Sequence, residues 1–302
     1  MFIIKHKKIF IGISATLVVL SILALSIFGM KVGIDFKGGA LTEVSYKVDR
    51  PTQVDLNKSI ASLNLGDVLL QPTGDSGYII KSRDLSDAEH TALLQVLANG
   101  NSSNMTELSF TSIGPSVGRE LTRKAIMSVI LISIVIICFI AFAFRKVSKP
   151  VSSWKYGLIA IITLLHDVAI PVGIYVLLSH FYGAEVDTLF VVAVLTILGL
   201  SVSDTIVIFD RIRENLRNQS VISKINFGET VGRSLSQSYV RSISTSSTVI
   251  LVLLALFFFG PITTKYFSLM LAAGMFFGTY SSIFLASPLL VLVEEWQKKK
   301  SV

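Results

Sequence analysis

The sequence predicts an α-helical polytopic membrane protein with six transmembrane helices and one extracytoplasmic α+β domain between the first helix and the second. Three observations predict this fold class. Of the 302 residues, 52% are hydrophobic and only 16% are charged, whereas a soluble domain carries about 25% charged residues. The apolar residues form six runs, each long enough to cross about 30 Å of hydrocarbon. One long, more polar stretch, 31–120, separates the first run from the second.

The first apolar run predicts an uncleaved membrane anchor, because it is longer than the roughly 7–15 residues of a signal-peptide core. With the N-terminal segment it forms a region 1–30, followed by the outer domain 31–120 and a five-helix region 121–302. The six predicted spans are 9–30, 125–144, 156–178, 188–209, 242–259 and 267–293.

Basic residues flank the apolar runs mainly on one side, which predicts that both termini are cytoplasmic. We therefore interpret the net charge of +7 as a topology signal and expect no nucleic-acid partner. Arg123 and Lys124 fall on the opposite side, after a long loop, where the rule is weak. The basic residues assigned to the cytoplasmic side are Lys5, Lys7, Lys8, Arg145, Lys146, Lys149, Lys155, Arg211, Arg213, Arg217, Lys224, Arg233, Lys298, Lys299 and Lys300.

The outer stretch predicts a small domain with a ferredoxin-like βαββαβ order. Alternation and turn residues indicate its strands, and Ser86 with Glu89 forms a capping-box pattern at the start of its second helix. It carries no Ser/His/Asp arrangement and no metal-ligand spacing, so we expect a binding or coupling domain rather than an enzyme. The predicted elements are strands at 41–48, 68–71, 78–82 and 105–113 and helices at 51–64 and 86–97.

Four ionisable residues lie in or beside the predicted spans: His166, Asp167, Asp204 and Arg241. At about 1.5 Å per residue, Asp167 lies roughly 16 Å into its span, and Asp204 lies roughly 8 Å from the cytoplasmic end of the next one. Ionisable groups at such depths are costly and mark ion pathways. Asp204 and Arg241 can meet if their helices are neighbours. They then form either part of a proton path or a static ion pair that joins two helices.

Five segments, in this order, resemble the SecF family of protein-export subunits in the RND superfamily. The stretch around Asp204 is the most specific. Ser203 departs from the family pattern, which usually has asparagine before this aspartate. The segments are Gly33–Gly39, Gly114–Leu121, His166–Val168, Ser201–Asn215 and Arg241–Ser246.

This resemblance implies a function in protein export. Members of the family pair with SecD, associate with the SecYEG channel, and use proton flow to help an unfolded polypeptide complete its passage across the bacterial cytoplasmic membrane. Asp204 and Arg241 match the charged positions tied to proton flow, and His166 and Asp167 match a motif beside them. The resemblance implies no cofactor and no metal, with protons as the coupling ion.

Two further groups of residues carry structural predictions. Asp210, Arg211 and Arg213 stand at the predicted cytoplasmic mouth, where they either hold a gate through salt bridges or form a solvated helix end. The segment with Asp35, Gly38 and Gly39 predicts a tight turn that opens the outer domain, since glycine accepts backbone conformations closed to other residues.

Three alternatives stay open from the sequence. One is an RND-type half-transporter for a small molecule or lipid, and another is a structural SecD partner that conducts no protons. The third is an intramembrane aspartyl protease, because such enzymes also carry two aspartates on consecutive spans, as Asp167 and Asp204 do here. Those enzymes need a GxGD sequence at the second aspartate, and the stretch from Gly199 to Asp204 does not supply it.

Overall fold

The computed structural model describes residues 2–47, 50–99, 102–143, 151–218 and 226–300, which form two compact units. One unit is a helical bundle of residues 1–31 and 128–302, and the other is an α+β domain of residues 32–127. Arg145, Lys146, Lys149 and Lys224, which were assigned to the cytoplasmic side, lie outside the described residues.

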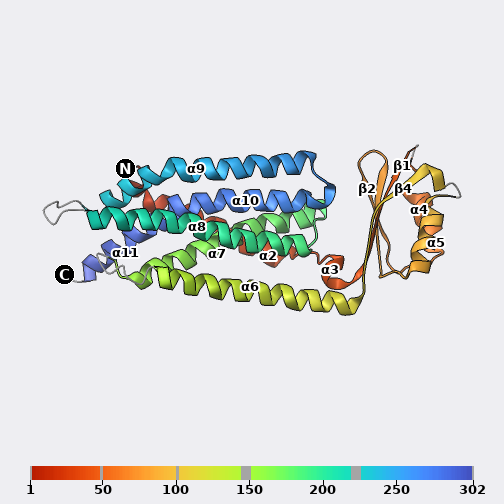
Figure 1. Ribbon diagram of the computed structural model, residues 1–302, viewed down its shortest axis with the longest axis horizontal. Coiled ribbons are helices and arrows are strands. Elements are labelled where there is room, and N and C mark those ends of the chain that lie inside the picture. The colour runs from red at the N-terminus through yellow and green to blue at the C-terminus, as the bar shows by residue number, and fades with distance from the viewer. Residues whose placement is uncertain (1, 48–49, 100–101, 144–150, 219–225, 301–302) are drawn as a thin grey trace. The chain divides into compact units, whose positions relative to one another are not determined.

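The long helices confirm the predicted fold class, because six of them are apolar and long enough to cross a membrane (Figure 1). A short helix α1 and two 3-10 turns, η1 and η2, accompany them. The elements are α1 Phe2–Lys5, α2 Lys7–Phe28, α6 Pro115–Ala143, α7 Ser153–Tyr182, α8 Thr188–Asn218, α9 Phe227–Phe259, η1 Ser102–Asn104, η2 Ile262–Thr264, α10 Lys265–Ser281, η3 Ser282–Ala286 and α11 Ser287–Lys300.

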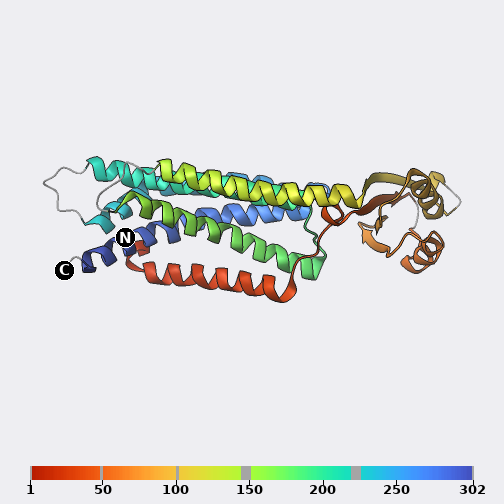
Figure 2. The same ribbon diagram turned by 90° about the horizontal axis from the view of Figure 1, so that it is seen from below.

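Helices α7 and α8 and the last span, α10 with η3 and α11, form the core of the bundle. Of their most apolar segments, 50%, 44% and 56% of the residues are buried, whereas α2 buries 6% and α9 buries 11%. Figure 2 shows α2 on the outside of the bundle beside α7, which it contacts. Apolar side chains that face outward along a helix are typical of a membrane-facing surface. The ionisable residues of α7 and α8 therefore belong to the best-packed helices.

The last predicted span, 267–293, is not one α-helix. It is interrupted by the π-helical segment η3, Ser282–Ala286. The Ser287 hydroxyl donates to the carbonyl oxygen of Ser282, five residues earlier, at 3.2 Å, which suits the wider turn of a π-helix. Single π-helical turns inside α-helices occur frequently at functional sites.

Helices α8 and α9 extend beyond the apolar runs that predicted them. Arg211, Arg213 and Arg217 lie on α8 and Arg233 lies on α9, so the predicted bounds of these helices, 188–209 and 242–259, were too short at the side predicted to be cytoplasmic. The polar extension of α9 buries an apolar stripe of Phe227, Val231 and Leu235, and this packing stabilises helix where the hydropathy is low.

The α+β domain has the predicted βαββαβ order and an antiparallel sheet with strand order β2-β3-β1-β4, as in ferredoxin-like domains. Helices α4 and α5 cover one face of the sheet, and the core between them includes the fully buried Val44, Leu93 and Leu97 (Figure 1). The elements are α3 Ile34–Lys37, β1 Gly39–Tyr46, α4 Gln53–Ala61, β2 Leu69–Thr73, β3 Gly77–Ser82, α5 Asp87–Leu97 and β4 Met105–Ile113.

The turn that opens this domain requires glycine. Gly38 and Gly39 have φ angles of +81° and +142°, which side chains rarely adopt. The half-buried Asp35 lies in the first turn of α3, just before them. The first turns of α6 pack against the same segment, where a Cβ on Gly118 would stand 2.9 Å from the carbonyl oxygen of Phe36. The positive φ angles of Gly38 and Gly39 and the close approach at Gly118 explain why glycines stand in the Gly33–Gly39 and Gly114–Leu121 segments.

The predicted capping box starts helix α5. The Ser86 amide donates to Glu89 Oε2 at 2.9 Å, the Glu89 amide donates to Ser86 Oγ at 3.4 Å, and Arg83 forms an ion pair with the same carboxylate. The hydrogen bond from Arg83, followed by those from Ser86, lowers the pKa of Glu89 to about 2 from 4.5.

We expect the start of α5 to lose stability as the pH falls from about 4.5 to about 2. The folded-state pKa of Glu89 is depressed, so its contribution is complete above the unfolded value and disappears as the carboxylate is protonated. Amide hydrogen exchange of α5 in the full-length protein measures this loss. In Glu89→Gln the pH dependence over that range should flatten, and an unchanged profile would contradict the assignment.

Candidate functional site

The four ionisable residues that the sequence places in or beside the spans lie in a cluster formed by α7, α8, α9 and α10. Asp167 on α7 is fully buried, and both of its carboxylate oxygens accept hydrogen bonds. Oδ1 accepts from Nδ1 of the neighbouring His166 at 2.8 Å. Oδ2 accepts from the hydroxyl of Ser281 at 2.7 Å and from the hydroxyl of Ser201. The carboxylate thus joins α7 to α8 and to the end of α10.

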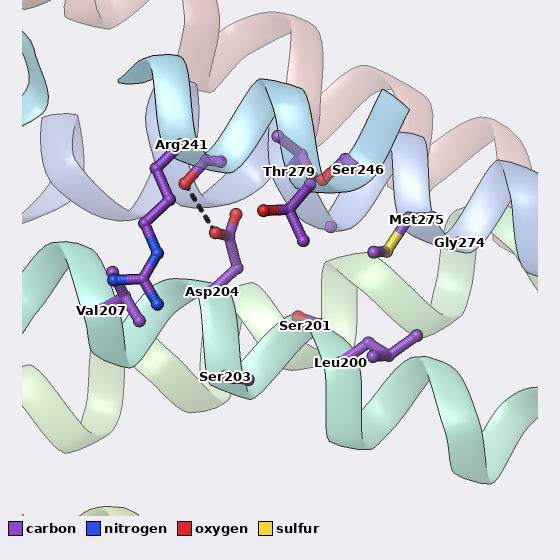
Figure 3. Close-up of a pocket in the computed structure, with 13 residues that line it drawn as sticks. Leu200, Ser201, Ser203, Asp204, Val207, Arg241, Ser246, Gly274, Met275 and Thr279 are labelled. Atoms are coloured by element: carbon purple, nitrogen blue, oxygen red, sulfur yellow. Dashed lines mark hydrogen bonds between the residues drawn. The ribbon is translucent and has the colours of Figure 1, made fainter. Parts of the chain in front are cut away.

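Asp204 on α8 lies in a different setting, because it lines a cavity of about 130 Å³ between α8, α9 and α10 (Figure 3). Its Oδ1 accepts a hydrogen bond from Ser242 of α9 at 2.7 Å. Its Oδ2 is buried and receives no hydrogen bond from the described residues. A cavity of this size, whose lining includes hydroxyl groups and charged side chains, has room for several water molecules. The polar residues that line it are Ser201, Ser203, Asp204, Arg241, Ser242, Thr245, Ser246 and Thr279.

Arg241 shares this cavity with Asp204 but forms no ion pair with it within 4.0 Å in the described part of the chain. Figure 3 shows its guanidinium extending past the carboxylate toward Val207. The position of Arg241 on the exposed side of α9 explains this, because the next residue, Ser242, faces inward and takes the contact with Asp204. The structure therefore brings the two charges into one cavity without the direct pairing considered for them.

Two further pairs of hydroxyl groups join the same helices near the carboxylates. Thr205, next to Asp204, exchanges a 2.8 Å hydrogen bond with Ser282 at the start of the π-helical segment. Ser246 of α9 is hydrogen-bonded to Thr279 of α10. Such short polar side chains allow close helix packing and supply sites along which protons can move.

Two more polar atoms next to Asp167 are buried without a hydrogen-bond partner among the described residues: His166 Nε2 and the hydroxyl of Tyr280. The two rings are stacked, with centroids 6.3 Å apart and an interplanar angle of 19°. Buried polar groups are normally hydrogen-bonded. Unpaired groups at this point therefore extend the polar cluster beyond Asp167.

The residues of the predicted cytoplasmic mouth stand apart from this cluster. Asp210 and Arg213 form an ion pair within α8, and both are largely exposed. Arg211 pairs with Glu214 at 2.6 Å and also donates to Gln237 of α9 at 2.7 Å. Among the contacts of Asp210, Arg211 and Arg213 with other described residues, only the one between Arg211 and Gln237 joins two helices. The Asp210–Arg213 pair matches a solvated helix end.

Several members of the cluster escaped the sequence prediction, above all Ser281 and Ser282. A pair of hydroxyl residues in an apolar run is normally read as packing. Their position in the middle of the last run, after Tyr280, is the signal that could have found them.

Comparisons with known proteins identify the family. The family model described as "Protein export membrane protein SecD/SecF, C-terminal" matches residues 93–296. The protein translocase subunit SecF of Thermobaculum terrenum is 40% identical and covers 98% of this chain and 94% of its own. The protein translocase subunit SecF of Pseudomonas aeruginosa is 34% identical, and the match covers 92% of this chain and 87% of that protein.

Solved structures agree with this result. The crystal structure of SecDF from Thermus thermophilus, a translocon-associated membrane protein, is 29% identical and superposes with a TM-score of 0.80 over 97% of this chain. A second SecDF structure, in the super-membrane-facing form, is 30% identical and superposes with a TM-score of 0.64. This chain spans 38% and 39% of those two SecDF chains. The chain therefore belongs to the SecF family of protein translocase subunits, which confirms the resemblance of its motifs and makes it a multi-pass membrane protein.

Proposed function

We propose that this chain pairs with SecD and uses the proton-motive force to promote a late step of protein export through SecYEG across the bacterial cytoplasmic membrane. The observation that carries the proposal is the placement of Asp204. Its carboxylate lies in a cavity between α8, α9 and α10 that hydroxyl groups and Arg241 help to line, with one oxygen free of hydrogen bonds in the described structure. A carboxylate so placed can take up and release a proton, and ionisable groups within membrane spans commonly serve proton relays.

The surroundings of Asp204 support proton movement over a purely structural role. A static ion pair with Arg241 would neutralise the carboxylate, and the two side chains are not paired within 4.0 Å. Arg241 nonetheless lines the same cavity. Asp167 and His166 supply a second ionisable pair on the neighbouring helix α7.

The proposed partners and orientation follow from the family and the bundle. The solved relatives are named SecDF, and this chain matches 38% of one of those chains, which supports SecD as the partner here. Helix α1 contacts α11, and Lys7 forms a 2.6 Å ion pair with Glu295. Both ends of the chain thus lie together, and the basic residues beside them support a cytoplasmic location for both.

The decisive experiment compares proton flux and protein export in vesicles that contain this chain with its SecD partner, as wild type and as Asp204→Asn. We expect both activities to fall together in the variant, by about a hundredfold or more, because an amide cannot exchange the proton. Glu229→Gln, which removes an exposed carboxylate at the start of α9, should leave both unchanged.

The results also separate the alternatives. Unchanged flux in Asp204→Asn, with SecD still bound, would refute a proton role for this carboxylate and favour a structural SecD partner. Flux that depends on Asp204 without any effect on export would favour an RND-type half-transporter for a small molecule or lipid.

A further inference from the structure

We propose that Ser201 is the relay through which protons pass between the Asp204 cavity and the buried Asp167. This inference rests on the proposed function and names a residue to which the family motifs give no role. Ser201 lies on α8, one turn before Asp204, and its side chain is 4% exposed. It lines the cavity and at the same time donates a hydrogen bond to Asp167 Oδ2.

The other partners of Asp167 do not offer this connection. His166 binds Oδ1 from α7, and Ser281 binds Oδ2 from α10. Neither is among the described residues that line the cavity, whereas Ser201 is. The hydroxyl of Ser281 also points to the carbonyl oxygen of Gly278 at 2.9 Å. These two residues therefore hold the carboxylate in place, and Ser201 gives it access to the cavity.

Asp204 lies where it can exchange protons with Ser201 through the cavity. Asp204 and Ser201 line the same cavity from the same face of α8, as residues three apart on a helix do. Cavity water can bridge the distance between a carboxylate and a hydroxyl oxygen with little loss of bond strength. The Ser201 hydroxyl then completes a continuous path from Asp204 to Asp167.

The transfer step is balanced in protons and charge. When Asp167 is ionised, the Ser201 hydroxyl gives its hydrogen to Oδ2, and the serine oxygen takes a proton from cavity water that Asp204 has protonated. One proton enters and one leaves, Asp204 returns to the ionised form, and Asp167 becomes neutral. Rotation of the new hydroxyl bond restores the starting geometry, and the reverse sequence carries a proton the other way.

The test measures proton flux in vesicles with the SecD partner for Ser201→Ala, Ser201→Thr and Thr196→Val. We expect Ser201→Ala to lower the flux about tenfold to a hundredfold, the range for loss of a positioned proton-transfer group. Ser201→Thr keeps the hydroxyl and should recover most of the flux. Thr196 lies on the same helix and donates only to its own backbone, to Val192 at 2.7 Å in this structure, so its loss should change nothing.

Two further readouts distinguish a relay from a structural role. Slower transport in D₂O than in H₂O should be clear in the wild type and in Ser201→Thr, because a proton moves in the limiting step. Co-purification with SecD checks that each variant is assembled. If Ser201→Ala fails to assemble, Ser201→Cys preserves the side-chain size while providing a weak donor, and its flux should be reduced in the same way.

The outcomes for the two sites are separable. Suppose that proton flux is lost in Asp204→Asn but stays within about twofold of wild type in an assembled Ser201→Ala. This result overturns the relay, because loss of a positioned proton-transfer group lowers the rate by far more than twofold. It leaves the proposed function standing. Equal loss in Ser201→Ala and Ser201→Thr also overturns the relay, because a structural change then explains both. Undiminished flux in Asp204→Asn refutes the proposed path and the relay with it.

Discussion

Replacing Asp167 by leucine is expected to lower the stability of the helical bundle by about 3 kcal/mol. Three donors, on His166, Ser201 and Ser281, share this carboxylate within the core. Leucine has the same branched shape but is larger and accepts no hydrogen bond, so the donors are left without their partner inside the core. The cost of each is roughly 1–3 kcal/mol, reduced where a hydroxyl can turn to a backbone carbonyl. Thermal unfolding of the purified protein should show a midpoint lower by about 5 °C or more.

Asp167→Asn is the matched variant, because its amide oxygen can still accept from both serines. We expect its unfolding midpoint to stay within about 2 °C of wild type, while proton flux is lost because the amide does not titrate. A leucine variant as stable as wild type would show that the three hydrogen bonds contribute little. Normal flux in the asparagine variant would place Asp167 outside the proton path and leave it a purely structural role.

The fold could be predicted closely because its signals are local. The run Met105–Ile113 was predicted as a strand, which the structure forms over the same residues, and the predicted capping box of Ser86 and Glu89 is present in full. Six apolar runs became six apolar helices. Each of these patterns depends on neighbouring residues in the chain, which is the information that a single sequence carries.

The site was predicted only in part, because its geometry depends on which way side chains turn. Depth along two helices could place Asp204 and Arg241 at one level, and both line the cavity. The estimated depth could not show that Ser242, rather than Arg241, contacts the Asp204 carboxylate. The π-helical turn at Ser282–Ala286 has no hydropathy signal, since it lies within a run that is apolar on both sides. Contacts between distant helices, such as Ser281 with Asp167, likewise follow from packing.

Replacing Gly39 by alanine is expected to destabilise the α+β domain by about 3 kcal/mol. Gly39 has a φ angle of +142°, and a Cβ there would lie 2.8 Å from the carbonyl oxygen of Ser82. The strained backbone alone costs about 1–2 kcal/mol. The clash adds to it, because Ser82 belongs to β3, which pairs with β1 next to Gly39 and cannot move without disturbing the sheet. Urea-dependent proteolysis of this domain in the full-length protein measures the change.

Gly74→Ala separates the two contributions. Gly74 also has a positive φ angle, +54°, but a Cβ there would meet nothing within 4 Å. We expect this variant to lose about 1 kcal/mol, the cost of the backbone conformation alone. Because the φ angle of Gly39 lies outside the left-handed helical region that Gly74 occupies, the difference between the two variants measures the clash with Ser82 together with the extra backbone strain at Gly39. Equal losses at Gly39 and Gly74 would mean that the sheet yields to the added methyl group. In that case the glycine that opens the domain is required for its backbone conformation and not for the close approach of the two strands.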